Sequence, residues 1–128
     1  MNKTVFFPVA MASLTLSISS FSTTTTLPDP LLAGWQGTPV CEKLHEDASQ
    51  RVLRCTFAPG VGHERHYHRA HFGYALSGGT MRIKDDAGTR DVSLKTNSFY
   101  HSAGTPWHEV INVGSTTVVY LIFEPKSE

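Results

Sequence analysis

Short apolar runs follow one another along the chain from Pro39 onward, and turn-forming residues separate them. Runs of this kind are typical of β-strands, and no stretch shows a long helical period with capping residues. The pattern predicts nine strands, over residues 39–44, 50–58, 64–68, 72–76, 80–85, 89–94, 98–101, 107–113 and 116–124. The last run, TTVVYLIFE, is β-branched and apolar enough to predict a central buried strand. Many short strands with frequent turns predict an all-β sandwich or barrel, and the chain length supports a single domain.

The N-terminal segment has a different pattern. Lys3 is followed by an apolar run that ends at Ile18 and then by a stretch rich in Ser and Thr. This order is typical of a secretory signal peptide, so we expect residues 1–22 to be removed and the mature protein to be periplasmic or secreted by a bacterium. The alternatives are an uncleaved anchor or an unstructured tail, although the run is short for a membrane span. We expect an irregular arm over residues 23–38 and the barrel domain over residues 39–125.

The polar, turn-like segment HEDASQ lies between Cys41 and Cys55. In a hairpin centred near Ala48 the two cysteines lie opposite each other, within reach of a disulfide if the register permits. An oxidising compartment favours this bridge. Two buried free thiols are the alternative, because a shift of one residue in the register would separate the sulfur atoms.

Three histidines, His66, His68 and His71, lie within six residues, and His108 begins a later strand. Successive side chains of a strand point to opposite faces, so His66 and His68 point the same way. His71 follows a short bend and can face the same point, as can His108 from a neighbouring strand. Imidazole is the commonest metal ligand, and an all-histidine set suits Fe, Mn, Ni, Cu or catalytic Zn. We therefore predict one divalent transition metal ion at these four histidines; the alternative is a set of solvated histidines on a barrel rim.

Residues 60–78 resemble the first sequence motif of the cupin superfamily, G(X)5HXH(X)3–4E(X)6G. The leading glycine is followed by five residues and then by His66 and His68, as in the motif. Counted back from Gly78, His71 occupies the position of the motif's metal-binding glutamate. The spacing from His68 to His71 is shorter than in the motif.

Residues 96–112 resemble the second cupin motif, G(X)5PXG(X)2H(X)3N, with departures. The matching residues are Gly104, His108 and Asn112, whereas Thr96 and Ser102 replace a glycine and a proline. One extra residue separates the matching glycine from the histidine. The resemblance implies a cupin-type jelly-roll β-barrel, a metal held by the HXH pair and His108, and a homodimer. Within the superfamily the chain is similar to small single-domain bacterial cupins that are often associated with β-alanine degradation.

Cupins include dioxygenases, isomerases, decarboxylases, sugar binders and storage proteins, so the fold alone does not select an activity. A shell without carboxylates is similar to the three-histidine iron sites of some cupin dioxygenases, in which a chelating substrate supplies the anionic ligands. We therefore expect an exported metal-dependent enzyme, dioxygenase-like, that acts on a small polar or chelating molecule. A non-catalytic module that binds a small ligand or senses a metal is the alternative. The 11 basic and 11 acidic residues balance without a basic block, which argues against nucleic acid, and no membrane contact is expected after signal cleavage.

Other residues are weaker candidates. Glu64 has the strand parity of His66 and His68, which is consistent with a rim position; the alternative is a missing carboxylate or a general acid–base group. His63 is predicted to be a solvated loop histidine, with support of the metal site as the alternative. Asn112 is expected to hold the end of its strand rather than to contact the metal. Parity and apolar character predict a core position for Phe72, Tyr74, Leu76, Phe99 and Tyr120, with pocket lining as the alternative for Tyr74.

Overall fold

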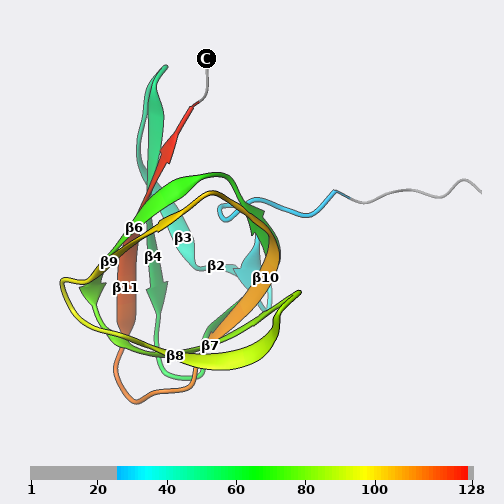
Figure 1. Cartoon of the computed structure of the whole chain (residues 1–128), viewed down its shortest axis with the longest axis vertical. Coiled ribbons are helices and arrows are strands. Elements are labelled where there is room, and N and C mark those ends of the chain that lie inside the picture. The colour runs from blue at the N-terminus through cyan, green and yellow to red at the C-terminus, as the bar shows by residue number, and fades with distance from the viewer. Residues whose placement is uncertain (1–25, 127–128) are drawn as a thin grey trace, which may run out of the picture.

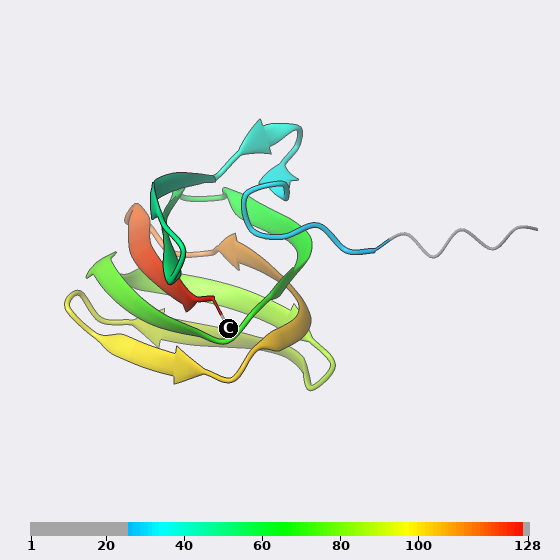
Figure 2. The same cartoon turned by 90° about the horizontal axis from the view of Figure 1, so that it is seen from above.

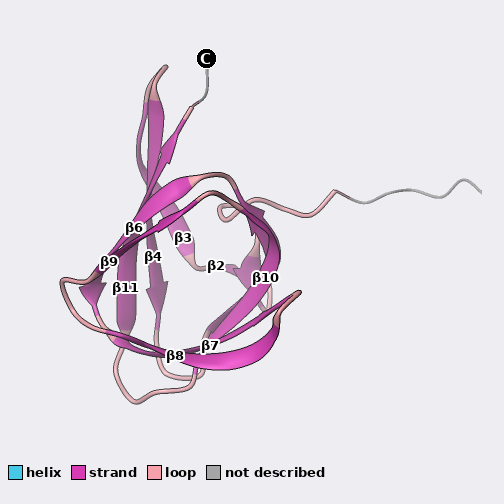
Figure 3. Cartoon of the chain, in the orientation of Figure 1, coloured by secondary structure: helices cyan, strands magenta, loops and turns pink. Residues whose placement is uncertain are grey.

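The computed structural model describes residues 26–126, and it consists of strands, turns and loops. Figure 3 shows this strand-rich architecture. The predicted signal peptide over residues 1–22 lies outside the described residues and stays a prediction. In the described part of the chain, no helix is long and apolar enough to cross a membrane.

The nine predicted strands are all confirmed, and each end lies within two residues of its predicted position. Two short strands, β1 (Gly34–Trp35) and β2 (Thr38–Pro39), precede them in the arm. The nine are β3 (Cys41–Glu46), β4 (Gln50–Phe57), β5 (Gly62–His68), β6 (His71–Ser77), β7 (Gly79–Asp85), β8 (Gly88–Leu94), β9 (Phe99–Ser102), β10 (Thr105–Asn112) and β11 (Val118–Pro125).

Two antiparallel sheets face each other and curve round a common interior (Figure 1). One sheet has the order β3-β4-β11-β6-β9 and the other the order β5-β10-β7-β8. Strand β11 is central, as predicted, and pairs with β4 on one side and β6 on the other. Between the sheets lies an apolar core that includes Leu53, Phe57, Met81, Val118 and Ile122. The predicted all-β jelly-roll barrel is confirmed.

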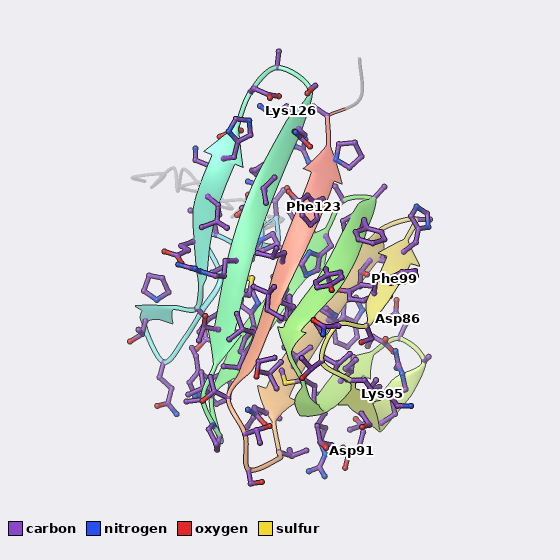
Figure 4. The ribbon with its side chains drawn as sticks, turned by 90° about the vertical axis from the view of Figure 1, so that its left-hand side faces the viewer. Asp86, Asp91, Lys95, Phe99, Phe123 and Lys126 are labelled. Atoms are coloured by element: carbon purple, nitrogen blue, oxygen red, sulfur yellow. A yellow bond between two sulfur atoms is a disulfide. The ribbon has the colours of Figure 1, made fainter. Side chains whose placement is uncertain are left out.

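Strand β6 directs its side chains differently from the prediction. His71 faces inward and is buried, so alternation sends Phe72 and Leu76 to the outer face, where they are exposed. Phe99 of β9 is 70% exposed and stacks on Phe72 with ring centroids 5.7 Å apart. Figure 4 shows this outer face, with Phe99 and Phe123 labelled on it.

The core predictions for Phe72, Leu76 and Phe99 were therefore wrong, and Tyr74 is half-buried on the same outer face. The core prediction for Tyr120 is confirmed, since this side chain is buried. His71 and Phe72 are neighbours on one strand, so their side chains cannot both face the interior. The side chain of His71 faces inward and that of Phe72 faces outward. The homodimer that the cupin resemblance implies stays a prediction.

Asn112 has the structural role expected of it. Its side-chain amide donates hydrogen bonds to the carbonyls of Phe57 and Thr116, at 2.9 and 2.8 Å, and its side-chain oxygen accepts one from the amide of Gly114. These bonds join the end of β10 to the end of β4 and to the loop before β11.

The arm packs against the barrel instead of standing free (Figure 2). Pro30 and Ala33 are buried. The carbonyl of Pro28 accepts a hydrogen bond from the amide of Tyr67, which fixes the arm along β5. Trp35 lies so close to Gly62 that a side chain at that glycine would overlap its ring. The arm therefore forms an outer layer over β5.

The predicted disulfide is confirmed: Cys41 and Cys55 are paired across β3 and β4 and are bonded to each other. Both residues are buried in the core. The bridge therefore ties the edge strand β3 to its sheet from within.

We predict that replacing Cys41 and Cys55 together by alanine lowers the free energy of unfolding by about 3 kcal/mol, because the unfolded chain regains the freedom that a closed loop of this size removes. Urea denaturation measures the change. Reductant is expected to destabilise the wild-type protein to a similar extent and to leave the double variant unaffected. Equal stability of the wild-type protein with and without reductant would contradict the prediction.

Candidate metal centre

A β-bulge in β5 decides which of its side chains face the interior. Val110 of β10 pairs with His63, and His108 pairs with His66, so two residues of β5 lie opposite one residue of β10. The extra residue breaks the strict alternation of the strand. The buried side chains of this face are therefore His63, His66 and His68.

The bulge also explains the positions of Glu64 and His63. Glu64 is exposed, and its carboxylate accepts a hydrogen bond from the amide of Gln36 at 2.9 Å, in the arm. It does not belong to the histidine group, so it is not the missing carboxylate. His63 is 1% exposed, so the prediction of a solvated histidine was wrong.

The ligand nitrogens of His66, His68 and His108 converge and lie within 4.8 Å of one another. Nε2 of His66 is 2.9 Å from Nε2 of His68 and 3.0 Å from Nε2 of His108. For a metal–nitrogen distance of about 2.1 Å, two ligands at a right angle lie about 3 Å apart. The two short separations therefore match neighbouring corners of one coordination shell.

Hydrogen bonding at the ring of His66 points to a cation at this position. The carbonyl of Glu64 lies 2.6 Å from Nδ1 of His66, so we assign the proton to Nδ1 and a lone pair to Nε2. The lone pair on Nε2 of His66 can accept one hydrogen bond, but the Nε2 atoms of both His68 and His108 face it. A metal ion shared by the three Nε2 atoms satisfies them all, so the residues present fit a divalent transition metal.

His71 is buried next to this group, with its ring centroid 4.8 Å from that of His68. Its Nδ1 lies 2.8 Å from the carbonyl of Arg69, which leaves Nε2 as an acceptor. The group of converging nitrogens contains only His66, His68 and His108 among the described residues. The role of His71 as a fourth ligand or immediate neighbour stays a prediction.

A buried carboxylate that the sequence analysis missed stands behind His68. Oε1 of Glu124 lies 4.0 Å from Nδ1 of His68, and both side chains are 3% exposed. Neither of these two atoms has another hydrogen-bond partner within the described residues. Arg51 donates to the other oxygen of Glu124 at 2.7 Å and to Asp29 at 2.8 Å.

The charge of Glu124 orients His68 toward the metal position. Burial alone would raise the pKa of Glu124, but the neighbouring His68 and Arg51 lower it below its usual value, so the carboxyl is ionised. A carboxylate behind Nδ1 favours the tautomer that leaves Nε2 free for a metal. The signal was present in the sequence, because Glu124 shares the parity of the apolar, inward-facing Tyr120 and Ile122, and a charge on that face needs a partner.

The arm supports the site from its outer side. The ring of His63 stacks under His66 with centroids 3.7 Å apart. Its Nε2 lies 3.1 Å from the carbonyl of Pro30 and 3.3 Å from that of Ala33. Together with the ion pair from Asp29 to Arg51, these contacts connect the arm to the surroundings of two ligands.

Burial keeps His63, His66 and His108 neutral. Burial and the neighbouring histidines lower the pKa of His66 to about 2 and that of His108 to about 3. The pKa of His63 falls to about 4 for the same reasons. Because only neutral imidazole binds a metal, His66 and His108 are ready to bind at neutral pH.

No protein-family model matches the sequence, and the search of curated proteins finds no match. Solved structures do match. A cupin domain from Bordetella pertussis Tohama I superposes with a TM-score of 0.65 at 20% identity, covering 69% of this chain and 93% of that one. The protein has the cupin fold. The fold that the resemblance implies is thus confirmed, while the similarity to proteins associated with β-alanine degradation stays a prediction.

Two further structures show how varied the proteins with this cupin fold are. The Cupin_2 domain of an XRE family transcriptional regulator from Enterobacter cloacae has a TM-score of 0.52 and 18% identity, with coverage of 70% of this chain and 97% of that one. The polyketide cyclase RemF from Streptomyces resistomycificus has a TM-score of 0.54 and 19% identity, with coverage of 66% and 63%. Similarity at this level shows the cupin fold, and function has to be argued from the site.

We predict that Glu124→Gln weakens metal binding by about 10- to 100-fold, because glutamine keeps the size of the side chain but removes the charge that orients His68. Competition with a chromophoric chelator measures the affinity. Glu42→Gln, at an exposed carboxylate paired with Arg54, is the matched control and is expected to bind metal normally. A folded Glu124→Gln variant with unchanged metal affinity would contradict the role assigned to this carboxylate.

We predict that the metal-free protein loses stability as the pH falls from 7 to 5. Histidines of the unfolded chain take up protons near pH 6.5, whereas His63, His66 and His108 stay neutral in the folded protein because burial lowers their pKa values. Between pH 7 and pH 5 these three histidines therefore take up protons only in the unfolded state. The free energy of unfolding falls by about 2 kcal/mol at pH 5 for each histidine that stays neutral.

Urea titrations of the metal-free protein at the two pH values measure this loss. Replacing the exposed His45 by glutamine is expected to leave the pH dependence unchanged, whereas His108→Gln is expected to reduce it. A flat profile between pH 7 and pH 5 would mean that the buried histidines accept protons in the folded state, contrary to the prediction.

Proposed function

We propose that the protein is a metal-dependent enzyme of the dioxygenase type, with His66, His68 and His108 as metal ligands and His71 as a fourth ligand or neighbour. The observation that carries the proposal is the convergence of three imidazoles, two of them buried and that of His108 half-buried, next to a cavity that His108 borders. Three protein ligands leave positions for substrate, a pattern found at catalytic rather than structural metal sites.

A divalent metal bound there supplies Lewis acidity and, for iron or manganese, redox chemistry with dioxygen. The three imidazoles bring no negative charge to the metal, so a substrate with anionic, chelating oxygens completes the shell. Glu124 and Arg51 contribute by fixing the ring of His68. The reaction we propose is the addition of both atoms of one dioxygen molecule to an organic substrate, which needs no external reductant.

A non-catalytic module that binds a small ligand or senses a metal is the second candidate. The observation that favours it is that no carboxylate, Lys or Arg of the described residues lines the cavity, so proton transfer there depends on histidine and tyrosine alone. The cupin domain of the transcriptional regulator from Enterobacter cloacae illustrates a cupin outside an enzyme, as RemF, by its name a cyclase, illustrates one within an enzyme.

We also propose that the protein is exported from a bacterial cell. The disulfide between Cys41 and Cys55 supports this location, because such bridges persist in oxidising compartments and are rare in the cytosol. The expected signal peptide in the sequence supports the same location.

We predict that protein purified from its own compartment contains one divalent transition metal per chain and consumes dioxygen when its substrate is present. Alanine at His66, His68 or His108 is expected to remove most of the metal without unfolding the barrel, whose core is apolar. Elemental analysis gives the metal content, and ¹⁸O₂ labelling shows whether both oxygen atoms enter the product.

His45→Ala, at an exposed histidine, is the matched control and is expected to keep the full metal content. His71→Ala separates a ligand from a neighbour: loss of metal identifies a fourth ligand, and full occupancy identifies a neighbour. Unchanged metal content in the His66, His68 and His108 variants would refute the metal site. If the protein contains its full complement of metal but consumes no dioxygen with any compound that it binds, the non-catalytic module is favoured.

A further inference from the structure

The cavity beside His108 has a volume of about 220 Å³ and lies between the two sheets. Its walls are mainly aliphatic side chains of β7, β8 and β10: Met81, Ile83, Val92, Leu94 and Val110. His108 is the one metal ligand among the residues that line it, so the metal position adjoins one side of an apolar chamber.

The charge of the lining limits what the chamber accepts. Among residues 26–126, neither Asp, Glu, Lys nor Arg lines it, although such residues make up 17% of the chain. A charged group buried there would lose its hydration without gaining a partner, which is strongly unfavourable. The chamber therefore favours a ligand whose body is uncharged.

Two tyrosines give the chamber its polar groups. Tyr120 of β11 is buried, and Tyr100 of β9, which is 40% exposed, places its ring across Gly73, where any side chain would overlap it. Desolvation raises the pKa of Tyr100 to about 12 and that of Tyr120 well above its usual value, so both remain O–H donors.

A buried tyrosine hydroxyl normally finds a partner. Tyr120 is 7% exposed and lines the chamber, so a ligand inside it is the partner within reach. The size of the chamber fits a single ring, because an apolar cavity of about 150 Å³ is enough for benzene.

We propose that the chamber binds a small phenolic molecule: one uncharged aromatic ring with an oxygen that accepts a hydrogen bond from Tyr120, and with vicinal oxygens directed toward His108. This inference rests on the proposed function for the metal-binding end of the ligand, and on the chamber alone for its apolar body. It narrows the expected small polar or chelating substrate to a chelating aromatic one.

The test uses metal-free protein and two probes, fluorobenzene and 4-fluorophenol, with binding followed by ¹⁹F NMR. Both are expected to bind. Tyr120→Phe is expected to weaken 4-fluorophenol about fivefold, through the loss of one hydrogen bond, and to leave fluorobenzene unchanged. Val92→Phe fills the chamber and is expected to abolish the binding of both probes. Val113→Phe is the same change at an exposed position and is expected to have no effect.

Several results would overturn the inference. They are failure of the folded wild-type protein to bind either probe, binding that survives Val92→Phe, and tighter binding of 4-fluorobenzoate than of 4-fluorophenol to the metal-free protein. Urea unfolding confirms that each variant is folded, and Tyr120→Phe, which removes only a hydroxyl, tests the inference even if Val92→Phe does not fold.

A second arm separates this inference from the proposed function. Loading the protein with Fe(II) or Mn(II) is expected to increase its affinity for 4-fluorocatechol more than tenfold and its affinity for fluorobenzene not at all. Equal affinity for the catechol with and without metal would refute metal binding by the ligand's oxygens. The results with metal-free protein would still test, independently of the metal, whether the chamber binds aromatic molecules.

Discussion

The irregular pairing of β5 with β10 is the constraint on which the site depends. In a regular antiparallel pair, Glu64 would share a face with His66 and His68, and His63 would lie on the other face. One extra residue in β5 reverses both positions, so the interior receives a third imidazole from this strand and no carboxylate. The bulge therefore determines the charge of the interior as well as its shape, because it keeps the only acidic candidate of this strand in solvent.

Burying several imidazoles requires polar partners, and the protein supplies them from outside the barrel interior. The carbonyls of Pro30 and Ala33 face His63, the carbonyl of Glu64 accepts from His66, and Glu124 faces His68. Glu124 is itself balanced by Arg51. Charged groups thus lie behind these histidines, whereas none of the residues that the structure describes places a charged carboxylate, Lys or Arg in the lining of the apolar chamber on the other side. This separation keeps the charges of Glu124 and Arg51 away from the cavity in a small domain.

Alternation and turn chemistry are local, so the nine strands, the hairpin and its disulfide could be predicted from the sequence. The convergence of His66, His68 and His108 could be predicted because the motif spacings carry it. The bulge could not, since no residue of HERHYH indicates it, and the wrong prediction for His63 follows from it. The exposed positions of Phe72 and Phe99 have another cause, because apolar character alone does not tell the two faces of a strand apart.

The contacts of the arm change where the functional unit begins. A chain that started at the first barrel strand would retain every ligand histidine and the complete core. It would lack the carbonyls beside His63 and the carboxylate of Asp29 that holds Arg51. A boundary drawn from the strand pattern alone would therefore cut through the supports of the histidine group.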